Sequence, residues 1–187
     1  MTAQTQGRLP EWYPGKPTPS SPRLSTITDE QLFQEAIAIL VSHLSSIFQV
    51  LELKLELPKR LKASPLLSDL QFLLKWARQG SPDDLETAEE TLIALETLFL
   101  RAPYGTALLP DSSPNGGAVS PKESCAVLFR ATTARICLEK NIAWRRADMA
   151  CLASLSGPYL RTLIDQGKAD PENMWPFLLT RGVTRGV

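Results

Sequence analysis

The sequence predicts an all-α protein, with an N-terminal helical association domain joined to a C-terminal module of three helices and preceded by a Pro-rich arm. Three observations predict this class. Apolar residues recur at helical spacing, capping residues stand where helices should begin, and no segment with strand periodicity has a second strand to pair with. The 187 residues, 43% of them hydrophobic, suffice for one domain with a small module.

Residues 1–25 form a predicted flexible arm. Five prolines and several Ser and Thr residues leave too little apolar surface to offset the entropy of ordering. The segments 14–17 and 19–22 have the PxxP spacing that docks in aromatic grooves, so the arm is a candidate docking site for a protein partner. A solvated tail is the simpler interpretation.

Three helices are predicted in residues 26–101, the association domain. Thr28 and Gln31 make a capping box, while Ser64 and Ser81 each precede a proline at the first helical position. Gly80 should end the second helix. The apolar positions expected in the core are Leu32, Phe33, Ala36, Ile37, Leu40, Val41, Leu44, Ile47, Phe48 and Leu51, then Leu66, Leu67, Leu70, Leu73, Leu74 and Ala77, then Leu85, Ala88, Leu92, Leu95 and Phe99.

Residues 51–57 are ambiguous, because apolar and charged residues alternate as in a strand although Glu and Lys are good helix formers. We expect a helix, since no partner strand is evident. Residues 102–120, rich in Gly, Pro, Ser and Asp, form a predicted linker.

A C-terminal module is predicted over residues 121–180, followed by a tail at 181–187. Ser120 and Glu123 make a second capping box, and a helix should run from Pro121 toward Asn141. Its apolar positions are Ala126, Val127, Phe129, Ala134, Ile136, Cys137 and Leu138.

Two short helices separated by a tight turn are predicted in residues 145–168. Ser156 is the expected N-cap of the second helix and Gly167 its end, while Leu155 fills the turn. The residues expected to face inward are Met149, Ala150, Leu152 and Ala153 in the first helix and Leu160, Leu163 and Ile164 in the second.

This spacing resembles a helix-turn-helix of the excisionase-like and MerR-like type, with residues 121–141 as the support helix. The second helix of that type ends in an apolar pair and a Gly followed by a charged residue, here Leu163, Ile164, Gly167 and Lys168. Two features depart from the pattern. Ser154 stands where the family usually has Gly, and residues 170–173 look like another capped helix start, so we expect no β wing.

The resemblance implies that residues 157–166 enter the major groove of double-stranded DNA. The candidates for reading bases are Tyr159, Arg161, Thr162 and Gln166. The candidates for phosphate contacts are Arg130, Arg135, Arg145, Arg146, Ser156 and Lys168. Because one small helix makes few base contacts, we expect a homodimer or higher homo-oligomer formed through the N-terminal helices.

The net charge of zero divides unevenly along the chain. Residues 31–120 carry seven basic and eleven acidic side chains, a net charge of −4, whereas residues 121–187 carry ten and six, a net charge of +4. The whole chain therefore cannot coat nucleic acid, but its C-terminal module can approach phosphate.

Other kinds of chemistry have little support in the sequence. His43 is the only histidine and lies in an apolar helical segment, and the three cysteines lack CxxC spacing, so we expect no enzyme, no metal site and no cofactor. No apolar stretch suits a membrane, and we expect a cytoplasmic protein. The alternative to DNA binding is a helical adaptor whose C-terminal hairpin binds protein.

Overall fold

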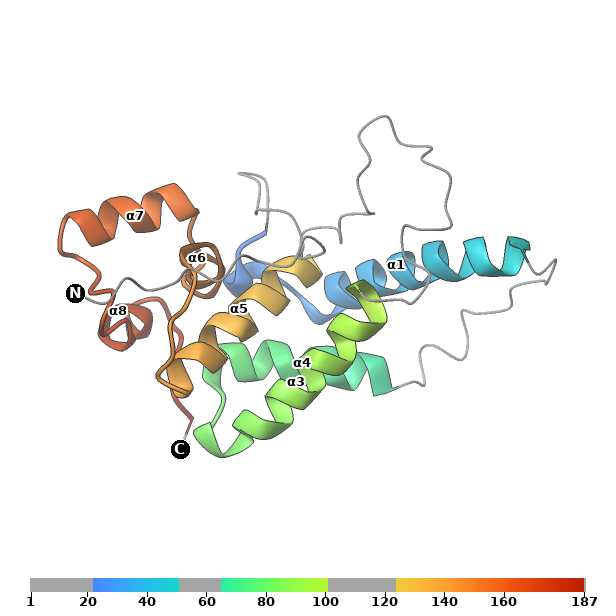
Figure 1. The fold of residues 1–187 in the computed structure, drawn as a ribbon, viewed down its shortest axis with the longest axis horizontal. Coiled ribbons are helices and arrows are strands. Elements are labelled where there is room, and N and C mark those ends of the chain that lie inside the picture. Colours follow the sequence, from blue (N-terminus) through green and yellow to red (C-terminus); the bar gives the residue numbers. More distant parts are fainter. Residues whose placement is uncertain (1–21, 51–64, 101–123, 187) are drawn as a thin grey trace.

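The all-α prediction is confirmed by a computed structural model, which describes residues 22–50, 65–100 and 124–186 (Figure 1). These residues form seven α-helices and no β-strand. The elements are η1 (Leu24–Thr26), α1 (Asp29–Val50), α3 (Pro65–Gln79), η2 (Pro82–Asp84), α4 (Leu85–Leu100), α5 (Ser124–Glu139), α6 (Arg146–Leu152), α7 (Gly157–Asp165) and α8 (Trp175–Leu179). The ambiguous segment 51–57, the linker and most of the arm lie outside the described residues.

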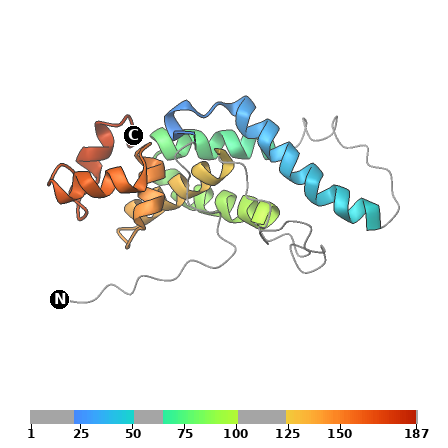
Figure 2. The same cartoon turned by 90° about the horizontal axis from the view of Figure 1, so that it is seen from above.

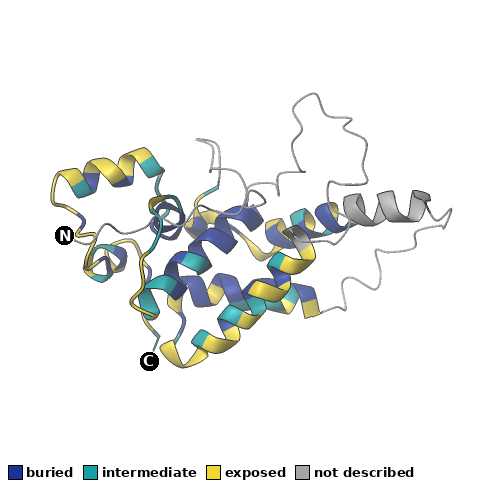
Figure 3. Ribbon diagram, viewed as in Figure 1, coloured by how far each residue is buried: buried dark blue, intermediate teal, exposed yellow. Residues whose placement is uncertain are grey.

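Helix α5 is the centre of the molecule. It is buried on nearly all sides, and its first seven residues, 124–130, are all buried (Figure 3). Helices α1, α3, α4 and α6 all pack against α5. This explains why α5 is buried around its circumference, whereas a helix at the surface buries one face only. The C-terminal half of α1 extends beyond this bundle in both views (Figures 1 and 2).

Two of the predicted helix starts are confirmed by their hydrogen bonds. The Thr28 N–H donates to the side-chain oxygen of Gln31 at 3.0 Å, and the Gln31 N–H donates to the Thr28 hydroxyl at 3.2 Å. The Ser81 hydroxyl accepts from the Asp83 N–H at 3.3 Å, although a 3₁₀ turn, η2, precedes α4 there. The predicted caps at Ser64 and Ser120 lie outside the described residues.

The N-terminal end of α5 has a cap that the sequence does not reveal. The N–H groups of Ser124 and Cys125 both donate to the carboxylate of Glu35 on α1, each at 3.1 Å. Burial raises the pKa of Glu35, and these hydrogen bonds partly oppose the rise. A carboxylate at a helix N-terminus is favourable, so Glu35 links α1 to the central helix.

The residues of the two predicted domains contribute to one apolar core. Buried residues from η1 to Val183 belong to a single cluster. The predicted tail is also part of the body, because the N–H groups of Thr184 and Gly186 donate to the carbonyls of Arg78 and Gly80, at 2.8 and 2.9 Å. These bonds satisfy carbonyls at the end of α3 that the helix itself leaves unpaired.

None of the helices in the described ranges is both long enough and apolar enough to cross a bilayer.

Gly80 follows the end of α3 as predicted. The structure requires glycine at this position because there is no room for a side chain. Its backbone is not left-handed, and a Cβ built there would lie 2.1 Å from Cδ1 of Trp76. The indole cannot easily move away, because its Nε1 donates to the Ser81 carbonyl at 3.0 Å and the Arg135 guanidinium lies 5.1 Å from the ring centre. A side chain at this position therefore overpacks the core.

Gly80→Ala should lower the free energy of unfolding by about 1–3 kcal/mol, measured by urea denaturation. Gly157→Ala is the matched control, because no atom from outside its own helix and chain neighbours lies within 4 Å of a Cβ at that glycine and its backbone is not left-handed. The control should change stability by less than about 0.5 kcal/mol. Equal stability of Gly80→Ala and the wild type would contradict the steric explanation.

Candidate nucleic-acid interface

Helices α5, α6 and α7 form a compact unit in which α6 packs on α5 and α7 packs on α6 (Figure 1). The inward faces predicted for the two short helices are confirmed, with one residue, Ile164, only half-buried. The buried residues are Met149, Ala150, Leu152 and Ala153 at α6 and Leu160 and Leu163 on α7. Leu155, in the turn, packs against the same core.

The turn between α6 and α7 is closed by Ser154 in the left-handed conformation, with φ of +56°. The next N–H, of Leu155, donates to the carbonyl of Ala150 at 2.8 Å, which is the Schellman closure of a helix end. Ser154 thus adopts the backbone conformation for which Gly is usual. Its hydroxyl also accepts from the Ser25 N–H at 3.2 Å, so the turn is held to the N-terminal segment.

The same closure ends the other C-terminal helices. Asn141 after α5, Gly167 after α7 and Gly182 after α8 have φ of +52°, +67° and +77°. In each case the following N–H donates to the carbonyl five residues earlier, at 2.9, 2.8 and 3.2 Å. The predicted end of α7 at Gly167 is confirmed, and the direction of each connection is fixed by hydrogen bonds.

The helix start expected at residues 170–173 is wrong. The Asp170 carboxylate accepts from the Glu172 N–H at 2.9 Å, and the Asp170 carbonyl accepts from the Asn173 N–H at 3.1 Å. These bonds close a tight turn, because Asp stabilises turns as readily as helix starts. Helix α8 begins only at Trp175.

The outward face of α7 carries the four candidates for reading bases. Tyr159, Arg161, Thr162 and Gln166 are all exposed, and Tyr159 also lines a pocket between α7 and α8. In Figure 3 most of α7 has the colour of exposed residues. Ser156 is the N-cap of α7, as predicted, since its hydroxyl accepts from the Tyr159 N–H at 3.4 Å. The helix therefore presents one polar face to solvent and buries the opposite one.

Arg161 lies 3.7 Å from the carboxylate of Asp165, and both side chains are two-thirds exposed. Exposed pairs of this kind contribute little stability, so the guanidinium can exchange this partner for another at small cost.

The six candidates for phosphate contacts fall into two groups. Arg146, Ser156 and Lys168 are exposed, and Arg145 is half-buried at the start of α6. Arg130 and Arg135 are 2% and 0% exposed, so we correct their assignment as phosphate contacts. The helical pattern could not reveal this, because arginine is seldom buried unless it is paired.

The buried arginines have partners inside the protein. Arg130 lies 3.3 Å from the carboxylate of Asp148. Burial raises the pKa of Asp148 to about 6, although the charges of Arg130 and Arg145 act in the opposite direction. Arg135 donates to the carbonyls of Ala77 and Gly80, at 3.1 and 2.7 Å.

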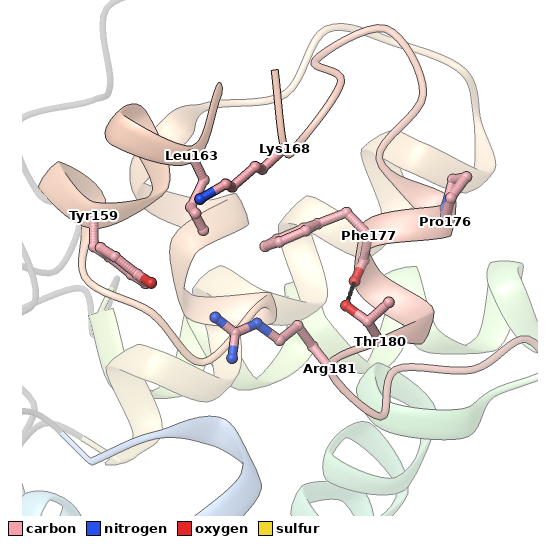
Figure 4. A pocket seen from close by; sticks show the side chains of 7 residues that line it. All are labelled: Tyr159, Leu163, Lys168, Pro176, Phe177, Thr180 and Arg181. Atoms are coloured by element: carbon pink, nitrogen blue, oxygen red, sulfur yellow. Dashed lines mark hydrogen bonds between the residues drawn. The ribbon is translucent and has the colours of Figure 1, made fainter. Parts of the chain in front are cut away.

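Sequence reasoning missed Phe177 and Arg181 as neighbours of α7. Together with Tyr159 and Lys168 they line an open pocket of about 440 Å³ between α7 and α8 (Figure 4). Arg181 falls in the predicted tail, and no local pattern indicates that α8 folds back beside α7.

No group of three or more His, Cys, Asp or Glu side chains is placed to hold a metal ion in the described part of the chain.

Burial raises the pKa of each of the three cysteine thiols, to about 12 for Cys151, so these thiols stay protonated and are poor nucleophiles.

No protein-family model, curated protein or solved structure matches this chain.

Substitutions at Ser154 should separate backbone strain from the Ser25 hydrogen bond. Ser154→Ala removes the hydrogen bond and keeps a side chain in the left-handed conformation, whereas Ser154→Gly removes both. We expect the Gly variant to be more stable than the Ala variant by about 1 kcal/mol in urea denaturation. An Ala variant as stable as the Gly variant would contradict the left-handed turn.

Asp148 should make stability depend on pH. Its pKa is higher in the folded state than its ordinary value of 3.8, so its contribution to stability is present below about pH 4 and is lost as the pH rises through about 6. The difference in unfolding free energy between wild type and Asp148→Asn should therefore fall by about 3 kcal/mol from acid to neutral pH. A difference independent of pH would show that the carboxyl is not perturbed.

Proposed function

We propose that this protein is a DNA-binding regulator that reads duplex DNA with α7. The observation that carries the proposal is the position of α7, whose apolar face is buried on α6 while most of its residues are exposed (Figure 3). An α-helix with its side chains is about 10–12 Å across, which matches the width of the major groove at about 12 Å. The polar face of α7 is exposed, as groove binding requires.

The contacts divide by chemistry. Arg161 has the fork of donors that pairs with the edge of guanine, and Thr162 and Gln166 supply a methyl group and an amide. Arg146 begins α6 and Lys168 follows the end of α7, and both side chains are exposed. These cations would contact phosphates and fix the register of the protein on the duplex.

We also propose that the protein binds as a homodimer, since two reading helices one turn of DNA apart give more contacts than one. Sedimentation of the protein with and without DNA measures this stoichiometry. The proposal includes no catalytic step and no cofactor.

Arg161→Ala should weaken binding to a sequence selected from a random duplex pool by about 1–3 kcal/mol and relax the preference at one base pair. Asp165→Ala is the matched control, because it breaks the same exposed ion pair but removes a negative charge. It should bind as tightly as the wild type or more tightly. Mobility shifts at about 50 and 200 mM salt measure both effects.

Arg145→Ala/Arg146→Ala should weaken binding to all sequences alike, since phosphates carry no sequence information. If the wild type shifts no duplex at either salt concentration, and a protein partner is recovered instead, the DNA proposal is wrong and the helical adaptor replaces it.

A further inference from the structure

The pocket between α7 and α8 is built by the ends of these two helices (Figure 4). Lys168 is placed by the closure of α7, where its N–H donates to the Leu163 carbonyl at 2.8 Å. Arg181 is placed by the end of α8, where its N–H donates to the Leu178 carbonyl at 2.8 Å. Both cations therefore start from backbone that hydrogen bonds hold in position.

Positive charge in this pocket is not neutralised. Among the described residues, no carboxylate lies within 4 Å of the Lys168 ammonium or the Arg181 guanidinium, whereas Arg161, Lys140 and Arg185 all have such a partner. The guanidinium of Arg181 lies 5.6 Å from the centre of the Phe177 ring. This ring supports Arg181 without cancelling its charge.

The polar groups converge on one space. Figure 4 shows the Tyr159 hydroxyl, the Lys168 ammonium and the Arg181 guanidinium directed into the pocket from different elements. Two cations and a hydroxyl donor around a small space match the chemistry of a phosphate group. Leu163 and Phe177 form the apolar floor.

We propose that this pocket binds a backbone phosphate of the DNA strand beside the groove that α7 enters. The inference rests on the proposed function and deepens it, because it adds Arg181 and α8 to the interface. Five of the seven residues that line the pocket are exposed, so it is too open to enclose a small molecule, as most small-ligand sites do. A phosphate that belongs to a long strand needs no such enclosure.

The geometry also explains how α8 serves a helix-turn-helix without a wing. The pocket opens beside α7, and a helix that fills the width of the major groove has phosphates along both of its flanks. On the flank of α7 that faces the pocket, α7 itself has no cation. Arg181, from the segment after α8, supplies one there.

The test measures how binding to one duplex depends on salt. Lys168→Ala and Arg181→Ala should each reduce the slope of log affinity against log salt by about 1, and each should weaken binding to every sequence alike. Arg161→Ala should instead change the sequence preference. Arg185→Ala is the matched control, since it removes a nearby positive charge that is paired with Glu139 and lies outside this pocket. Its slope should equal that of the wild type.

The outcomes separate this inference from the proposed function. If the wild type binds DNA and both pocket variants, folded by circular dichroism, keep its slope, the phosphate contact is overturned and the DNA-binding function stands. If the wild type binds no DNA, both are overturned. A nuclear magnetic resonance titration with inorganic pyrophosphate then shows whether the pocket takes a free phosphate group, a result that also overturns the strand contact.

Discussion

The buried guanidinium of Arg135 is the interaction on which the rest of the structure depends. It donates to two carbonyls at the end of α3 and lies 5.1 and 5.4 Å from the ring centres of Trp76 and Trp175. Glu139 pairs with it and also with Arg185 of the C-terminal segment. One side chain of the central helix therefore joins α3, α8 and the end of the chain. Removing a partner from a buried, hydrogen-bonded charge is costly. The positions of α3, α8 and the C-terminal segment relative to α5 are therefore strongly constrained.

This arrangement determines where α7 can lie. Helix α6 is held to α5 by apolar packing and by the pair of Arg130 with Asp148. The left-handed closures at Ser154 and Gly167 then set the direction of α7 and of the chain after it. Among the described residues, most of the polar face of α7 has no neighbour, and the helix itself is held on a rigid support. Rigid presentation limits the conformational entropy lost when a partner binds.

The electrostatics of the C-terminal part change when the fold is considered. Its surplus of positive charge in the sequence includes Arg130 and Arg135, which are buried, and Lys140 and Arg185, which pair with Glu89 and Glu139. Among the described residues, Arg161 lies on α7, and Lys168 and Arg181 line the pocket beside it. The position of these cations, more than the net charge, is what the proposal of DNA binding rests on.

The sequence by itself determined the helices of this protein, since capping residues and apolar spacing are local signals. Thr28, Ser81, Ser156 and Gly167 act at helix ends as the pattern predicts, and the inward faces of α6 and α7 follow from spacing alone. Only the tertiary structure decided that the two predicted domains share one core, that two arginines are internal, and that α8 lies beside α7. Each of these depends on contacts between residues far apart in the chain, as between Glu35 and the start of α5. Such contacts depend on which surfaces meet, and a pattern within one helix carries no information about its partners.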